Sequence, residues 1–102
     1  MKNVFDRLNK VFENRVRLGI MSLLMVEEWV SYNSLKTTLK KTDGNLASHI
    51  KMLRKEAYIE EKKTFLNRKP HTTYRATKEG RTAFTDHLDA LEQIIKGVEE
   101  DK

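Results

Sequence analysis

The chain has 102 residues, of which 20 are lysine or arginine and 15 are aspartate or glutamate, and it contains no cysteine. This length fits one domain with a single core and leaves little room for a deep substrate cleft or a separate ligand-sensing domain. The absence of cysteine excludes disulfides, thiolate metal sites and cysteine nucleophiles. No stretch resembles a signal peptide or a membrane span, so we expect a cytoplasmic protein without a membrane partner.

Charge is unevenly distributed along the chain. From Lys36 to Arg81 there are 13 lysines and arginines against 5 acidic residues, whereas the remainder holds 7 against 10. A basic middle between mildly acidic ends predicts a polyanion-binding surface flanked by segments with another role. The alternative is that these lysines are only solvated surface residues.

Amphipathic helices are predicted at the N-terminal end. Apolar residues recur at helical spacing from Val4 to Phe12, which indicates one short helix. Asn14 is suited to cap a second helix that runs to about Val26, with Ile20 on its buried stripe. These two helices are expected to supply part of the core.

Two further helices follow, joined by a tight turn. Trp29 and Val30 form a short apolar step, after which Ser31 can cap a helix that ends near Lys40. Thr42 or Asp43 can cap the next helix, which extends to about residue 56. Its apolar residues recur at the spacing expected of one buried face.

A hairpin and a long helix complete the chain. Residues 58–65 and 72–76 are rich in β-branched, aromatic and charged residues and predict two strands, with residues 66–71 as the loop. Thr77 can cap a last helix to about Val98, which would be roughly 33 Å long at about 1.5 Å per residue. A helix of that length is too long to pack wholly on so small a domain.

The order of these elements predicts a mainly α fold with a small β-wing (α+β), the winged helix-turn-helix. Residues 1–102 are expected to form one such DNA-binding domain, with residues 1–13 and 84–102 contributing to a dimer interface. In this fold the second helix of the pair, the recognition helix, exposes one face to the major groove of a duplex.

The recognition helix is predicted to bury Leu46, Ile50 and Leu53 and to expose the opposite face. An asparagine can pair with an adenine edge, a lysine can reach guanine or phosphate, and a methionine can touch a thymine methyl. The alternative is an ordinary polar helix surface. The candidate DNA-binding residues on this helix are Asn45, Ser48, His49, Lys51, Met52 and Lys55, with His49 as a helix-flank or phosphate contact.

The hairpin is predicted to hold phosphates beside the groove, because its outer part is basic. We expect Arg68 to enter a minor groove, where a narrow A·T-rich stretch concentrates negative potential. The alternative is a solvated β-turn. The candidate DNA-binding residues of the wing are Lys62, Lys63, Asn67, Arg68, Lys69 and His71.

The last helix carries an apolar seam with heptad spacing, which needs a partner. Part of it should pack on the protein's own first helix, and the distal half is expected to meet a second copy across a two-fold axis. The candidate dimer residues are Val4, Phe5, Leu8 and Phe12 near the N-terminus and Phe84, Leu88, Leu91, Ile94, Ile95 and Val98 in the last helix.

From Asn14 to Ile95 the chain resembles the MarR-like and ArsR-like winged-helix transcriptional regulators, especially their minimal single-domain members. The stretches that carry the resemblance are 17–20, 42–53, 68–77 and 79–84. The resemblance implies a homodimer that reads a palindromic operator and acts as a repressor by occlusion. One departure is Ala57, where such proteins usually have glycine; a left-handed alanine there would cost on the order of 1 kcal/mol.

Other functions are less well supported by the sequence. No nucleophile–base pair, phosphate loop or paired carboxylate is found, so we expect no enzyme activity and no cofactor. His49, His71 and His87 lie on three different predicted elements, which disfavours a metal site. A small-molecule effector is possible but has no support in the sequence. The main alternative is a winged helix used as a protein-interaction module. RNA binding is a third option, which lacks an exposed stacking platform because Tyr32, Phe65, Tyr74 and Phe84 are expected to be buried.

Overall fold

The computed structural model describes the backbone of residues 3–100 and the side chains of residues 3–97. Most of the chain is helical, and three strands, β1 (Val30–Ser31), β2 (Ile59–Leu66) and β3 (Lys69–Ala76), form one antiparallel sheet with the order β1-β3-β2. The predicted fold class, mainly α with a small β-wing, is confirmed. The elements are η1 (Val4–Arg7), η2 (Lys10–Phe12), α1 (Arg15–Val26), β1 (Val30–Ser31), α2 (Tyr32–Leu39), α3 (Asp43–Lys55), β2 (Ile59–Leu66), β3 (Lys69–Ala76) and α4 (Lys78–Glu100).

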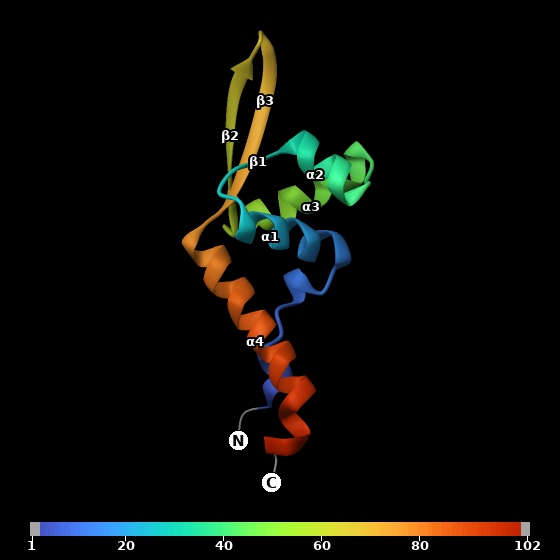
Figure 1. The fold of residues 1–102 in the computed structure, drawn as a ribbon, viewed down its shortest axis with the longest axis vertical. Coiled ribbons are helices and arrows are strands. Elements are labelled where there is room, and N and C mark those ends of the chain that lie inside the picture. The colour runs from blue at the N-terminus through green and yellow to red at the C-terminus, as the bar shows by residue number, and fades with distance from the viewer. Residues whose placement is uncertain (1–2, 101–102) are drawn as a thin grey trace.

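The molecule is elongated, with principal extents of 61 × 25 × 21 Å. The body consists of α1, α2 and α3, and the β2–β3 hairpin projects from one end of it (Figure 1). Helix α4 projects from the opposite end, with η1 packed along it. The two projections are therefore well separated, and each can serve a different partner.

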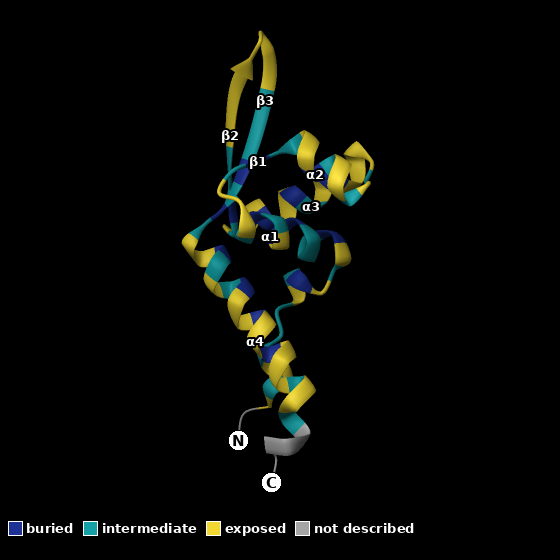
Figure 2. Cartoon of the chain, in the orientation of Figure 1, coloured by how far each residue is buried: buried dark blue, intermediate teal, exposed yellow. Residues whose placement is uncertain are grey.

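The core lies where α1, α2, α3 and the base of the sheet meet (Figure 2). Leu46, Ile50 and Leu53 of α3 are buried, as their spacing predicted. Burying a side chain of this size stabilises a fold by roughly 1.5–3 kcal/mol. The other buried apolar residues are Phe12, Val16, Ile20, Met21, Leu24, Val30, Leu35, Ile59, Tyr74, Ala76, Phe84 and Ala90.

Three predicted helix starts are confirmed, because each capping side chain accepts hydrogen bonds from the first turn. Asn14 Oδ1 accepts from the backbone N–H groups of Val16 and Arg17, both at 3.0 Å. Ser31 accepts at the start of α2, and Thr42 does so at the start of α3. Local chemistry thus fixes where the three helices of the body begin.

The single helix predicted over residues 4–12 is wrong, since the segment forms two short 3₁₀ turns. Asn3 and Asn9 each cap one turn, accepting from the backbone N–H of Phe5 and Val11, respectively, at 2.9 Å. An asparagine side chain offers the backbone an alternative to helical bonding, and Asn9 does so in the middle of the predicted helix. The chain consequently bends between η1, which lies along α4, and η2.

The hairpin loop is also shorter than predicted. The strands continue to Leu66 and from Lys69, which leaves only Asn67 and Arg68 in the turn. Their φ values are 52° and 66°, as a two-residue primed turn requires. Pro70 lies beside the closing pair, where the antiparallel ladder turns the backbone nitrogen away from the partner strand, so proline does not interrupt β3.

Helix α3 ends in a Schellman motif. The backbone N–H of Tyr58 donates to Leu53 O at 3.0 Å, and that of Ala57 donates to Arg54 O at 2.9 Å. Ala57 has a φ of 62°, so alanine takes the left-handed position that glycine usually fills. The sequence did not predict how this helix ends. The structure shows the usual Schellman motif, with alanine at the position that is usually glycine.

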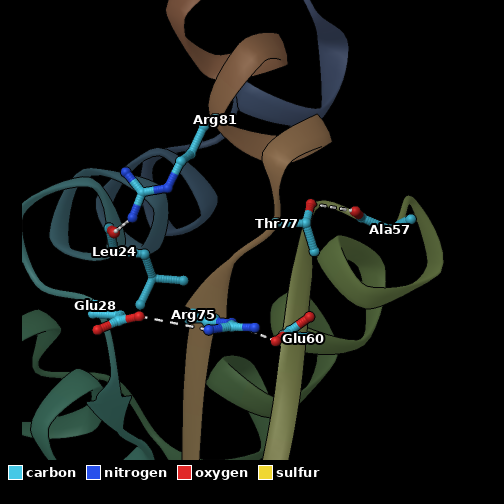
Figure 3. Close-up of polar contacts among 7 residues, drawn as sticks. All are labelled: Leu24, Glu28, Ala57, Glu60, Arg75, Thr77 and Arg81. Atoms are coloured by element: carbon cyan, nitrogen blue, oxygen red, sulfur yellow. Dashed lines mark hydrogen bonds and ion pairs between the residues drawn. The ribbon is translucent and has the colours of Figure 1, made fainter.

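The start of α4 is seated against this helix end. Thr77 Oγ1 donates to Ala57 O at 2.7 Å and accepts from the backbone N–H of Gly80 at 2.9 Å (Figure 3). A Cβ at Gly80 would lie 2.0 Å from Tyr58 O, so only glycine permits this approach. The end of α3, the start of the hairpin and the start of α4 therefore form one rigid junction.

Candidate nucleic-acid interface

The recognition helix α3 is held at its N-terminal end by contacts with α2. Lys36 Nζ lies 3.0 Å from Asp43 Oδ1, and the Tyr32 hydroxyl donates to the same carboxylate at 3.1 Å. The hydrogen bond from Lys36 lowers the pKa of Asp43, with a further contribution from Tyr32. These exposed contacts join the start of α3 to α2, and the angle between the two helices determines how α3 meets a groove.

The face of α3 opposite its buried stripe is exposed. Lys51, Lys55 and Asn45 lie in solvent, and Met52 is 40% exposed. Ser48 is exposed as well, although its hydroxyl donates to Asn45 O at 2.9 Å. The predicted reading face is therefore accessible, and it carries amide, ammonium and thioether groups and no carboxylate.

His49 lies on the flank of α3 and is half-buried. The Arg17 guanidinium donates to His49 Nδ1 at 2.9 Å, and Arg17 Nε donates to Val11 O at 2.6 Å. Burial, followed by the positive charges of Arg17 and Lys41, lowers the pKa of His49. Its Nδ1 accepts a bond from a group that can only donate, so the imidazole is neutral and joins α3 to α1. Arg17 was missed as a site residue, because sequence spacing does not reveal this contact.

The outer hairpin carries the predicted wing residues. Lys63, Asn67, Arg68 and Lys69 are exposed, and His71 is half-exposed. Together with Lys62 they give residues 62–71 four cationic side chains and no acidic one. The predicted wing residues thus lie in one basic segment of the hairpin, which projects from the body (Figure 1).

Lys62 differs from its neighbours because it stacks on Trp29. Its Nζ lies 4.3 Å from the centre of the indole ring, and the Arg75 guanidinium lies 4.7 Å from that ring. Arg75 also pairs with Glu60 and, at 3.5 Å, with Glu28 (Figure 3). From the sequence, Trp29 was expected only to belong to a short apolar segment. In the structure its ring makes cation–π contacts with Lys62 and Arg75, which stabilise the base of the hairpin.

A second contact joins the hairpin to α3. Arg54 lies 3.5 Å from Glu61 Oε1, and the Tyr74 hydroxyl donates to Glu61 Oε2 at 2.7 Å. Burial and the hydrogen bond to Glu61 raise the pKa of Tyr74. Neither Arg54 nor Glu61 was predicted as a site residue, because only the register of the folded strands brings them together. Through them the wing keeps a fixed position beside the recognition helix.

The prediction that Phe65 is buried is wrong, since its side chain is 77% exposed. The next residue, Leu66, is 56% exposed. Both lie in the part of β2 that extends beyond the body, where no helix among the described residues covers either face (Figure 2). Tyr74 and Phe84 are buried as expected, and Tyr32 is half-buried. The wing therefore carries apolar as well as cationic side chains.

Two of the predicted dimer residues are not available to a second chain. Phe12 and Phe84 are each 2% exposed and pack edge to face, with ring centroids 5.1 Å apart, in the protein's own core. The end of η2 and the first turns of α4 lie against α1 and the base of the sheet, so these rings are covered within one chain. This corrects the inclusion of Phe12 and Phe84 in the dimer interface.

The rest of the terminal apolar surface is at least partly exposed. Phe5, Leu88, Leu91 and Ile95 are 58%, 42%, 38% and 82% exposed, respectively. Val4, Leu8 and Ile94 are half-buried, and the side chain of Val98 lies outside the described residues. The described part of α4 thus keeps an apolar strip along its distal half.

His87 fastens the N-terminal segment to α4. Its Nδ1 accepts from the backbone N–H of Asn9 at 3.0 Å, and the ring packs beside Phe12 with centroids 5.5 Å apart. Burial lowers the pKa of His87, against a smaller opposite effect of Glu13. His87 lies on α4, whereas His49 lies on α3 and His71 on β3. Within residues 3–97 we find no group of three or more histidine, aspartate or glutamate side chains that could hold a metal ion.

A paired helix-turn-helix with a basic hairpin beside its second helix defines the class of winged helix-turn-helix DNA-binding proteins. Residues 16–95 match the family described as winged helix DNA-binding domain, and the chain belongs to that family. This match covers the body, the hairpin and most of α4. It does not distinguish the MarR-like and ArsR-like groups, so the narrower resemblance stays a prediction. No helix in the described part of the chain is long and apolar enough to cross a membrane.

The chain is similar along most of its length to several known proteins. An uncharacterized protein of Methanocaldococcus jannaschii is 36% identical over 90 residues, which are 88% of this chain and 98% of that protein. The solved structure of the transcriptional regulator homologue protein from Pyrococcus horikoshii OT3 has a TM-score of 0.81 and 30% identity, covering 88% of this chain and 89% of that one. A structure from Thermoplasma acidophilum, with a TM-score of 0.68, 15% identity and coverage of 90% and 92%, shares the fold.

Proposed function

We propose that this protein is a cytoplasmic transcriptional regulator that binds a palindromic DNA operator as a homodimer and represses by occlusion. The observation that carries the proposal is the arrangement of α3. Leu46, Ile50 and Leu53 are turned into the core, while the amide and ammonium groups of the opposite face lie in solvent beside the basic hairpin. A solvent-exposed helix face of this composition and size fits a major groove about 12 Å wide.

The recognition face supports reading of base edges. Asn45 can donate to and accept from an adenine edge, and Lys51 and Lys55 can reach guanine or phosphate. Met52 offers an apolar surface to a thymine methyl. His49 is neutral and bonded to Arg17, so we assign it a positioning role for α3 together with a contact near the phosphates.

The wing supports the phosphate contacts that supply most of the affinity for a duplex. Arg68 stands at the turn, where a thin hairpin can enter a minor groove, and Lys63 and Lys69 can meet the flanking phosphates. Lys62 is held over Trp29 and contributes its charge from the base of the wing.

A protein-interaction module would more often present apolar anchors on the recognition face.

A homodimer formed through the terminal segments would fit a palindromic operator, because each chain could bind one half-site. The exposed apolar residues Leu88, Leu91 and Ile95 of α4, and Phe5 of η1, lie at the end of the molecule away from the hairpin, so pairing there leaves both recognition helices free. The related Pyrococcus horikoshii structure is named a transcriptional regulator homologue, which agrees with this role.

The test is selection of bound duplexes from a random library with the full chain. We expect enrichment of one sequence containing two inverted half-sites, spaced by about one helical turn or a multiple of it, roughly 34–36 Å. Enrichment of a single half-site would contradict the proposal that a homodimer binds a palindromic operator. Recovery of random duplexes, or of none, would contradict sequence-specific regulation altogether.

A further inference from the structure

The outer end of the hairpin combines exposed apolar side chains with positive charge. Phe65 is 77% exposed, and Pro70 lies directly across from it on the neighbouring strand. Figure 2 shows this end of the hairpin exposed on both strands. An aromatic ring and a proline ring side by side on a thin, solvent-exposed ribbon form a small apolar surface that the chain itself leaves uncovered.

The strand register tells which face of the hairpin carries this surface. Residues two apart on a strand share a face, so Phe65 lies on the face of Lys63 and Glu61. Nearer the body, Glu61 on this face lies 3.5 Å from Arg54 of α3. The apolar pair is therefore on the side of the hairpin turned toward the recognition helix, whereas Leu66 and its partner Lys69 occupy the opposite face.

The charge around the apolar pair indicates its partner. Residues 62–71 contain four lysines and arginines and no acidic residue, so the surface suits a polyanion. With α3 in a major groove, the hairpin beside it reaches the adjacent minor groove, which is only about 6 Å wide. The two-residue turn makes the tip thin, and Phe65 stands one residue short of that turn.

We propose that the Phe65–Pro70 pair is an apolar wedge that enters the minor groove of bound duplex DNA, unstacks one base step and bends the duplex. This inference depends on the proposed binding of α3 and the wing to duplex DNA. Phenylalanine and proline are among the side chains that proteins insert between base steps from the minor groove. Pyrimidine–purine steps unstack most easily, so the step under the hairpin should be of this kind, although the protein reads no base edge there.

The experiment measures the end-to-end distance of a duplex by fluorescence energy transfer, using a duplex selected by the unaltered protein. We expect the protein to shorten that distance and Phe65→Ala to restore most of it, with affinity reduced about tenfold. Phe65→Leu should retain a substantial part of the bend, because a large apolar side chain remains. Since Phe65 is mostly exposed, its truncation removes little buried surface, and unchanged circular dichroism and thermal unfolding would verify the fold.

Leu66→Ala is the matched control. It removes an apolar side chain of similar exposure from the adjacent residue, on the opposite face, and should leave the bend unchanged. Equal effects of Phe65→Ala and Leu66→Ala, or a bend that survives Phe65→Ala, would overturn the wedge.

The outcomes also separate the wedge from the function on which it rests. A selected duplex that is bound but stays straight would refute the wedge alone, whereas failure to bind any duplex would refute both. If Phe65→Ala weakened binding of a single-stranded oligonucleotide and left duplex binding intact, the ring would be a stacking platform for single strands, and the wedge would be wrong.

Discussion

Ala57 ends the recognition helix in a conformation that alanine rarely adopts. Its φ of 62° permits both hydrogen bonds of the Schellman motif, and its carbonyl accepts a 2.7 Å bond from Thr77. A Cβ in the left-handed region costs on the order of 1 kcal/mol, because it crowds the neighbouring carbonyl. The junction between α3, the hairpin and α4 is thus held at some expense in stability.

We therefore expect Ala57→Gly to raise the free energy of unfolding by about 0.5–1 kcal/mol, after allowance for the greater freedom of glycine in the unfolded chain. Ala47→Gly is the matched control, since Ala47 is an exposed residue in the interior of the same helix. It should lower the free energy of unfolding by up to about 1 kcal/mol. Urea denaturation measures the free energy of unfolding of both variants. A lower value for Ala57→Gly than for the unaltered protein would contradict backbone strain at Ala57.

At the scale of the elements, local capping chemistry made much of the fold predictable. Asn14, Ser31 and Thr42 were expected to cap helices, and each accepts the first-turn hydrogen bonds of its helix. The buried stripe of α3 followed from spacing alone. Such features depend on residues within one or two turns of the chain, which is why sequence patterns reveal them.

Features that depend on distant contacts were not predictable in the same way. Asn9 breaks the N-terminal helix partly through its backbone bond to His87, which is far away in the sequence. That Phe12 and Phe84 are covered within one chain, and not by a second copy, depends on how α4 leaves the body, and the exposure of Phe65 depends on how far the hairpin extends beyond it. The alternation of residue types along a strand indicates which side chains share a face. It does not indicate whether another element covers that face.

The apolar strip of α4 leads to a prediction about assembly. Leu91→Glu combined with Ile95→Glu should convert the protein into monomers, because it places charges within the proposed seam between two chains. Thr85→Glu combined with Gln93→Glu is the matched control, as it adds two charges to exposed polar positions of the same helix. Sedimentation or light scattering measures the mass, and an unaltered protein that is already monomeric would end the dimer proposal.

At the scale of the whole molecule, the long shape separates two surfaces. The hairpin and the apolar strip of α4 lie at opposite ends of a molecule 61 Å long, with α3 between them. A duplex bound by α3 and the wing therefore leaves the distal half of α4 free for a second copy. Glu61, Arg54 and the stack on Trp29 keep the wing fixed relative to α3, so both parts can engage one duplex without rearrangement.

The most direct measurement is the affinity of the Lys51→Ala, Lys55→Ala double variant for a selected duplex and for a scrambled one, by fluorescence anisotropy at fixed salt. We expect the ratio of the two affinities to fall by about tenfold or more, since both ammonium groups lie on the exposed face of α3 that we propose reads the bases. Lys10→Ala with Lys78→Ala removes the same charge from positions off the recognition face and should preserve the ratio. If the Lys51, Lys55 variant kept the ratio of the unaltered protein, α3 would not be the element that reads DNA.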